Sequence, residues 1–153
     1  IISTGAQARW LNLKSEQNFR GFGVSACATC DGFFFKDKEV AVVGGGNAAV
    51  EEAMFLTKFA SKVKLIHRRD KLRAEKMLQE KLKANKKVEI IWDSIVEDVM
   101  GTTEPKGVNA IKIKNVKDNT SKELKVDGLF MGRHFPCLIR PGDFLAVIAA
   151  TVN

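Results

Sequence analysis

Two cysteines separated by two residues, with a carboxylate directly after the second, lie near the start of the chain. The segment reads Cys27-Ala28-Thr29-Cys30-Asp31. Two sulfurs at this spacing can bond within one helical turn, and a position at the start of a helix favours the reactive thiolate. Asp31 could then transfer a proton to the departing thiolate. The pattern predicts reversible dithiol–disulfide chemistry, with Cys27, Cys30 and Asp31 as the catalytic residues.

A structural zinc site is an alternative use of two cysteines at this spacing. Such a site needs two further ligands, and the remaining candidates are Cys137, His67 and His134, which form no second pair at zinc-ribbon spacing. We therefore predict no metal site. A pair of idle buried cysteines is the other alternative. Cys137 stands alone, and no role is assigned to it.

A glycine-rich turn follows an apolar segment further along the chain. Residues 40–49 read Val-Ala-Val-Val-Gly-Gly-Gly-Asn-Ala-Ala, which matches the pattern G-x-G-x-x-G/A with alanine in the third place. The glycines allow a sharp turn and a close approach of backbone N–H groups to a phosphate, and the helix N-terminus adds partial positive charge. We predict a dinucleotide site formed by the turn and the helix after it, comprising Gly44, Gly45, Gly46, Asn47, Ala48, Ala49 and Glu51.

Basic residues occupy the region that selects between NADH and NADPH. An NADH site usually has an acidic residue about 20 residues beyond the glycine turn, which binds the ribose 2′-hydroxyl. Residues 67–73 here read His-Arg-Arg-Asp-Lys-Leu-Arg, and Arg69 and Arg73 would lie one helical turn apart and converge on one anion. We predict a preference for NADPH, bound through His67, Arg68, Arg69 and Arg73. The alternative is that these arginines belong to a general basic surface.

The composition is that of a globular protein with a local excess of positive charge. The 153 residues are 45% hydrophobic and 28% charged and carry a net charge of +7, and their length fits one domain. The basic residues concentrate between Lys58 and Lys87, which a solvated helix surface mostly explains. A polyanion-binding module is the alternative. Nucleic-acid readers usually interleave aromatic residues with basic ones, and residues 62–87 hold no Phe, Trp or Tyr, so we predict no nucleic-acid partner.

No segment has the pattern of an export signal or a membrane span. The longest apolar run, residues 144–152, is far shorter than the roughly 20 residues that cross a bilayer. Three scattered cysteines do not make a secreted disulfide framework. We therefore expect a soluble, cytoplasmic protein without a membrane partner. Because the chain starts without methionine, we also expect it to be part of a longer protein.

Hydrophobic periodicity predicts a sheet around these motifs. Short apolar or alternating runs predict three strands, over residues 38–43, 62–66 and 88–92. Three further alternating runs predict an antiparallel meander, over residues 95–99, 108–116 and 123–126. One last apolar strand is expected over residues 128–131. We expect residues 1–6 to end a strand and residues 12–23 to be connecting structure.

Two helices are predicted between the first three strands. One covers residues 47–60, with Glu51 and Glu52 in its first turn, where the helix dipole favours negative charge. The other begins at an Asp70 cap and runs to about Asn85, with an inward face formed by Leu72, Met77, Leu78 and Leu82. Strands alternating with helices predict a parallel sheet with helices packed over it, a fold of the α/β class with the antiparallel meander as an insertion.

Taken together, these motifs resemble bacterial thioredoxin reductase of the low-molecular-weight flavoprotein type. The matching segments are residues 23–32, residues 42–47 with 50–53, and residues 67–70 with 73–75, and the likeness runs in order from about Ile1 to Phe130. The resemblance implies a Rossmann-like three-layer FAD/NAD(P)-binding domain. It also implies that NADPH and FAD are the cofactors, and that electrons pass from NADPH through FAD and the dithiol to thioredoxin. The complete enzyme would be a homodimer.

The resemblance also implies roles for single residues. Cys27 and Cys30 would form the redox disulfide, with Cys30 facing the flavin and Cys27 attacking thioredoxin, and Asp31 would be their acid–base partner. The 2′-phosphate of NADPH would lie against Arg68, Arg69 and Arg73. Ala48 stands where a hydroxyl residue is usual, which removes one pyrophosphate hydrogen bond worth about 1 kcal/mol.

The same resemblance divides the chain into three parts. Residues 1–10 would be the trailing edge of a flavin-binding domain and a hinge, residues 11–131 the NADPH-binding domain with the dithiol, and residues 132–153 a divergent tail. We expect this chain alone to be inactive as a reductase, because a nicotinamide hydride does not reduce a disulfide without the flavin. The alternative within the same architecture is the flavoprotein reductase partner of a peroxiredoxin, which has similar motifs and an additional N-terminal domain.

Overall fold

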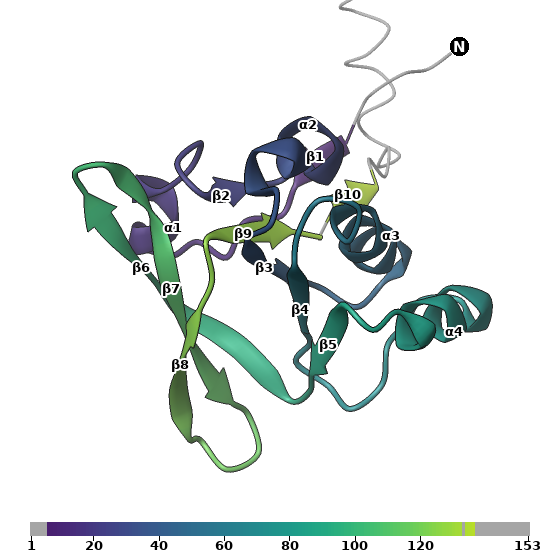
Figure 1. The fold of residues 1–153 in the computed structure, drawn as a ribbon. Coiled ribbons are helices and arrows are strands. Elements are labelled where there is room, and N and C mark those ends of the chain that lie inside the picture. Colours follow the sequence, from purple (N-terminus) through teal and green to yellow (C-terminus); the bar gives the residue numbers. More distant parts are fainter. Residues whose placement is uncertain (1–5, 133, 137–153) are drawn as a thin grey trace, which may run out of the picture.

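A five-stranded parallel sheet forms the centre of the computed structural model, which describes residues 6–132 and 134–136 (Figure 1). The neighbouring strands, in spatial order, are β2 (Val24–Ser25), β9 (Gly128–Met131), β3 (Glu39–Val43), β4 (Lys62–Ile66) and β5 (Val88–Ile91). All four pairings in this sheet are parallel. The carboxyl ends of the strands therefore meet at one edge, which is where open α/β sheets bind their ligands.

Helices cover one face of the parallel sheet. They are α2 (Ala28–Asp31), which continues into a 3₁₀ turn, η1 (Gly32–Phe35), then α3 (Asn47–Leu56) and α4 (Lys76–Ala84). Val40, Val42 and Leu65 point from the sheet into this layer, where they pack with buried side chains that include Leu56 and Leu82. Alternate residues of each strand thus supply the contact, as the two-residue period of a strand requires.

An antiparallel meander covers the opposite face of the parallel sheet. Its strands are β6 (Ser94–Thr103), β7 (Lys106–Asn115) and β8 (Ser121–Lys125), drawn in green in Figure 1. Ala41 and Val43, which alternate with the helix-facing residues of β3, pack here with Val99, Ile111 and Leu129. Because both faces of the parallel sheet are covered, its strands are apolar along nearly their whole length. The prediction of a three-layer α/β fold with a meander insertion is confirmed.

Two short segments from opposite ends of the described chain form a separate small sheet. β1 (Ala6–Ala8) pairs antiparallel with β10 (His134–Pro136), so that Ala6 lies opposite Pro136. Through this pairing, the segment that follows β9 lies beside β1 (Figure 1). The expected strand over residues 1–6 falls mostly outside the described residues, as does Cys137.

Several local predictions are wrong, all in helical or connecting segments. The second helix starts at Lys76 with Glu75 as its N-cap, so Asp70 caps nothing. Met77 is 60% exposed and does not face the core. Glu51 and Glu52 lie beyond the first turn of α3, which begins at Asn47. The segment expected to be purely connecting contains α1 (Lys14–Asn18).

Within the part of the chain that the structure describes, no helix is long and apolar enough to cross a membrane.

Candidate nucleotide and dithiol sites

Both predicted sites lie at the carboxyl edge of the parallel sheet. Cys27 follows β2, the glycine turn that begins at Gly44 follows β3, and His67 follows β4. β2 and β3 both pair with β9, so a single strand separates the two motifs in the sheet. The chain order of the motifs alone does not fix this arrangement, because it depends on β9, which comes about a hundred residues later.

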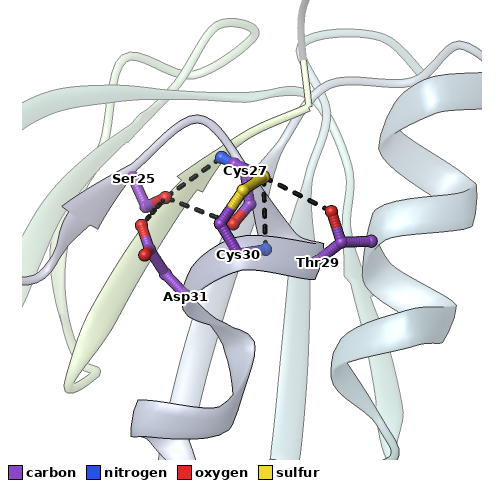
Figure 2. The surroundings of a disulfide bond; sticks show 5 residues. All are labelled: Ser25, Cys27, Thr29, Cys30 and Asp31. Carbon is purple, nitrogen blue, oxygen red and sulfur yellow. Dashed lines mark hydrogen bonds between the residues drawn. A yellow bond between two sulfur atoms is a disulfide. The ribbon is translucent and has the colours of Figure 1, made fainter.

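Cys27 and Cys30 form a disulfide at the start of α2 (Figure 2). Cys27 is the N-cap of this helix, and its Sγ accepts a hydrogen bond from the Cys30 N–H at 3.2 Å. The Cα atoms are 5.3 Å apart, which is the ordinary separation for two bridged cysteines. Cys30 is exposed and Cys27 is half-buried. If Cys27 became a thiolate, the Cys30 N–H that now contacts its sulfur could donate the same hydrogen bond to it.

Asp31 is held by a residue that the sequence reasoning missed. The Ser25 hydroxyl donates to Oδ2 of Asp31 at 2.5 Å and accepts from the Cys27 N–H at 3.0 Å (Figure 2). A second hydroxyl, that of Thr29, lies 3.3 Å from the Cys27 sulfur. The signal that could have revealed Ser25 is a polar residue in the apolar run just before the dithiol.

The glycine turn is packed too closely for a side chain at its first position. A Cβ on Gly44 would lie 2.5 Å from Cβ of Ala49 and 2.6 Å from the carbonyl oxygen of Gly132. Ala49 is buried, and a Cβ on Gly132 would in turn lie 2.6 Å from its Cα. The small third residue thus lets α3 approach β3 and β9, in agreement with the packing reason behind the fingerprint.

Gly46 faces open space, unlike Gly44 and Gly45, the other two glycines of the turn. It is the N-cap of α3, no side chain caps the helix, and a Cβ on Gly46 would meet nothing within 4 Å. A pocket of about 370 Å³ opens at this point. Residues that end or follow β1, β3, β4 and β9, together with the first residues of β6, line it: Arg9, Leu11, Val43, Gly44, Gly45, Gly46, Asn47, Ala48, Ile66, His67, Arg68, Arg73, Ser94, Ile95, Val96 and Gly132.

This pocket fits the pyrophosphate of a dinucleotide. Its floor is a turn without side chains at the positively polarised end of a ten-residue helix, and Arg68 and Arg73 lie at its wall. Of the other predicted cofactor residues, Ala49 is buried beneath the turn, whereas Arg69 and Glu51 are exposed and do not line the pocket. Arg69 and Glu51 as cofactor ligands stay predictions from the sequence.

The basic segment after β4 is a loop clamped onto the glycine turn. The N–H groups of Arg73 and Ala74 both donate to the Gly45 carbonyl, at 2.7 and 3.2 Å. Asn47 and Glu75 bond reciprocally: the Glu75 N–H donates to Oδ1 of Asn47 at 2.9 Å, and the Asn47 amide donates to the Glu75 carboxylate at 3.3 Å. These contacts prevent a helix from starting at residue 70.

The clamped loop changes how the arginines reach the pocket. Arg69 and Arg73 were expected one helical turn apart, and that expectation is wrong because neither residue lies in a helix. Arg73 reaches the pocket because its backbone is bound to Gly45, and Arg68 because it directly follows the end of β4. Asn47, which we predicted as a cofactor residue, uses its side chain to hold this loop.

The buried ring of His67 packs against Gly45 of the glycine turn. It is only 6% exposed, its Nε2–H donates to the Lys71 carbonyl at 2.9 Å, and a Cβ on Gly45 would run into its ring. Burial lowers the pKa of His67 from its usual 6.5, although hydrogen bonding to the backbone acts in the opposite direction, and Arg73 and Arg69 lower it further. The ring is therefore neutral near pH 7 and fixes the position of the turn.

This buried histidine predicts a fall in stability on mild acidification. The unfolded chain binds a proton on His67 near pH 6.5 and the folded chain only at lower pH, so unfolding takes up a proton in that window. The free energy of unfolding should decrease as pH falls from 7 through 6.5, by at most about 1.4 kcal/mol per pH unit from this group. Urea titrations between pH 5 and 8 should show a smaller slope for His67→Gln. The matched control His134→Gln removes the chain's other histidine, and an unchanged slope in His67→Gln would contradict the prediction.

The described residues contain no cluster of side chains that could bind a metal ion. In residues 6–132 and 134–136, no group of three or more His, Cys, Asp or Glu side chains is placed to hold a metal ion. The two sulfurs that a zinc site would need are bonded to each other. Of the ligands considered for zinc, Cys137 lies outside the described residues.

A parallel α/β sheet with a glycine turn, a pocket and a disulfide at its carboxyl edge is the arrangement typical of a dinucleotide-binding oxidoreductase domain. The comparison with family models agrees, because the model described as "Pyridine nucleotide-disulphide oxidoreductase" matches residues 1–133. The chain belongs to this family.

Similar proteins cover most of this chain, while the chain covers less than half of them. The thioredoxin reductase of Rickettsia conorii is 56% identical over 131 residues, which are 86% of this chain and 42% of that protein. The crystal structure of thioredoxin reductase from Streptococcus pyogenes matches with a TM-score of 0.79 at 47% identity, over 83% of this chain and 41% of that one. Lactococcus lactis thioredoxin reductase in its "FR conformation" matches with a TM-score of 0.82 at 40% identity, over 87% and 44%.

Proposed function

We propose that the chain is the NADPH-binding and dithiol part of a thioredoxin-disulfide reductase. In the complete enzyme, electrons would pass from NADPH through FAD to the Cys27–Cys30 disulfide and on to thioredoxin. The observation that carries the proposal is the position of the disulfide and the phosphate-sized turn at one edge of one sheet. The names of the similar proteins support the choice of thioredoxin over other disulfide substrates.

The chain's share of nucleotide binding is to hold the pyrophosphate and select the 2′-phosphate. The N–H groups at the start of α3 point toward the open space at Gly46 and would donate to the pyrophosphate oxygens. Arg68 and Arg73 would contact the 2′-phosphate, and Arg69 adds charge nearby. NADPH bound here would supply the hydride, and FAD in the complete enzyme would be the chemical link between that hydride and the Cys27–Cys30 disulfide.

The chain's share of thiol chemistry is a balanced two-electron exchange. The Cys27–Cys30 disulfide takes up two electrons and two protons and becomes two thiols. Cys27 then attacks the disulfide of thioredoxin, and Cys30 attacks the resulting mixed disulfide, which restores the Cys27–Cys30 bond and releases reduced thioredoxin. Cys30 is the more exposed of the two cysteine residues in this structure, and we assign it the side on which the flavin would lie.

Two phenylalanines beside the dithiol suit a protein substrate. Phe33 and Phe34 follow Cys30 in η1 and are 67% and 70% exposed. Large apolar side chains with this exposure, close to a reactive group, are typical of a surface that a partner covers. We propose that thioredoxin covers them when its disulfide reaches Cys27.

The domain division, the cellular location and the oligomeric state are further parts of the proposal. Residues 11–131 would be the nucleotide-binding domain, and the β1–β10 pair would lie at its junction with the rest of the enzyme. The chain spans about 42% of the length of the Rickettsia relative, so the flavin-binding share would come from the remainder of the enzyme. We propose a cytoplasmic homodimer for that complete enzyme.

Titration with the two nicotinamide nucleotides tests the proposed site. NADPH should bind the chain more tightly than NADH, because only NADPH has the phosphate that Arg68 and Arg73 would contact. Arg73→Ala should weaken NADPH binding by about 10- to 100-fold, the effect of losing a charged hydrogen bond, and leave NADH affinity nearly unchanged. Lys71→Ala is the control, because it removes a positive charge from the same loop but not from the pocket wall. Equal losses in Arg73→Ala and Lys71→Ala would contradict the assignment.

A further inference from the structure

We propose that Ser25 is a positioning residue that keeps Asp31 beside the dithiol in both of its protonation states. The inference rests on the proposed dithiol function and deepens it, because it assigns a residue that neither the motif nor the comparisons identify. It starts from the contact in Figure 2 in which one hydroxyl joins the Asp31 carboxylate to the backbone of Cys27.

Ser25 is a buried polar residue in an otherwise apolar place. It is 8% exposed, it ends the edge strand β2, and it precedes the dithiol by two residues. Its oxygen accepts the Cys27 N–H at 3.0 Å, which leaves its single hydrogen to be donated. Two acceptors are within reach of that hydrogen, the Asp31 carboxylate at 2.5 Å and the Cys27 carbonyl at 3.4 Å.

These two acceptors give the hydroxyl two positions. While Asp31 is ionised, the hydroxyl donates to Oδ2, the shorter and charge-assisted bond. When Asp31 takes up a proton, Oδ2 becomes a donor to the Ser25 oxygen, and the Ser25 hydrogen can turn to the Cys27 carbonyl. Every polar group keeps a partner in either state, so the carboxyl group need not leave its place when it gains or loses a proton.

A fixed carboxyl group matters for thiol exchange because the protons must return. In the reduced chain, the Cys27 thiol gives its proton to Asp31, and the thiolate attacks one sulfur of an external disulfide. A mixed disulfide forms, and the thiolate that leaves takes the proton back from Asp31. Cys30 then attacks Cys27 in the same way and releases the second thiol. Two electrons leave the chain, and the external disulfide becomes two thiols.

The test follows oxidation of the reduced chain by glutathione disulfide, so it needs neither nucleotide nor thioredoxin. In a Cys137→Ser background, the rate of disulfide formation is measured by acid quench, alkylation and intact mass between pH 6 and 9.5. Ser25→Ala should be about tenfold slower than the parent near pH 7, the effect of losing one charge-assisted hydrogen bond. The two rates should converge above about pH 9, where a free cysteine ionises without a base.

Five further variants separate positioning from a merely structural role. Ser25→Thr keeps the hydroxyl and should restore the parent's rate near pH 7, and Ser25→Gly is the second deletion if Ser25→Ala does not fold. Asp31→Asn should show the same loss confined to low pH, and adding Ser25→Ala to it should cost nothing more. Ser61→Ala, an exposed hydroxyl away from the dithiol, is the control.

The possible results are distinct. A Ser25→Ala rate equal to the parent's at every pH would overturn the inference, and so would a loss that is independent of pH and persists in Asp31→Asn. A parent chain that fails to form the Cys27–Cys30 disulfide would instead overturn the proposed dithiol function.

Discussion

Replacing Cys30 with serine is expected to abolish the intramolecular disulfide and to trap the chain on thioredoxin. With Cys30 absent, Cys27 can still attack the thioredoxin disulfide, but no second thiol is present to release the product. The mixed disulfide should therefore accumulate, and turnover in the complete enzyme should fall by several orders of magnitude, as when a catalytic nucleophile is removed. Non-reducing electrophoresis and intact mass would detect the adduct.

Cys27→Ser is the matched comparison for this trap. If Cys27 is the attacking sulfur, this variant loses the disulfide equally but forms little adduct with thioredoxin. Both experiments use a Cys137→Ser background, so that a single thiol remains of the three in the chain. Adduct formation by Cys27→Ser and not by Cys30→Ser would reverse the assigned roles, and its absence from both would argue against thioredoxin as the partner.

Alanine substitutions at two adjacent glycines are expected to affect different properties: Gly45→Ala the stability of the fold, and Gly46→Ala the affinity for NADPH. A Cβ on Gly45 runs into the His67 ring, which cannot move without losing its bond to Lys71, so Gly45→Ala should destabilise the fold by about 1–3 kcal/mol. Gly46 has extended backbone and empty surroundings, so Gly46→Ala should unfold with nearly the parent's free energy. Its new methyl group would occupy the place of the pyrophosphate and weaken NADPH binding at least about 10-fold.

Thermal unfolding and NADPH titration of both variants separate these effects. For a chain of this length, the Gly45→Ala loss corresponds to a midpoint lower by roughly 2–4 °C per kcal/mol. Gly107→Ala is the control, since its Cβ also meets nothing within 4 Å but the residue lies in the meander, outside the nucleotide pocket. Unaltered NADPH affinity in Gly46→Ala would move the nucleotide site away from this turn.

Local sequence patterns were enough to predict the parallel sheet and the types of chemistry at the two sites. The apolar run in residues 38–43 and the alternation in residues 62–66 depend only on local sequence, and strands form at Glu39–Val43 and Lys62–Ile66. The glycine turn was equally readable from the spacing of its glycines, and in the structure Ala49 and Gly132 leave no room for a side chain at Gly44. The two cysteines are three residues apart, so their bond needed no distant partner.

The way in which the functional side chains are held depends on contacts between segments that are distant in the sequence. Residues 70–75 have helical spacing, yet they form a loop because the Gly45 carbonyl and Asn47, more than twenty-five residues away in the chain, bind its N–H groups. The closeness of the dithiol to the glycine turn likewise depends on β9, which lies between β2 and β3 in the sheet. Asp31 bonds to Ser25 because β2 ends beside α2. Local propensity is worth a few tenths of a kcal/mol per residue, and hydrogen bonds formed at long range override it.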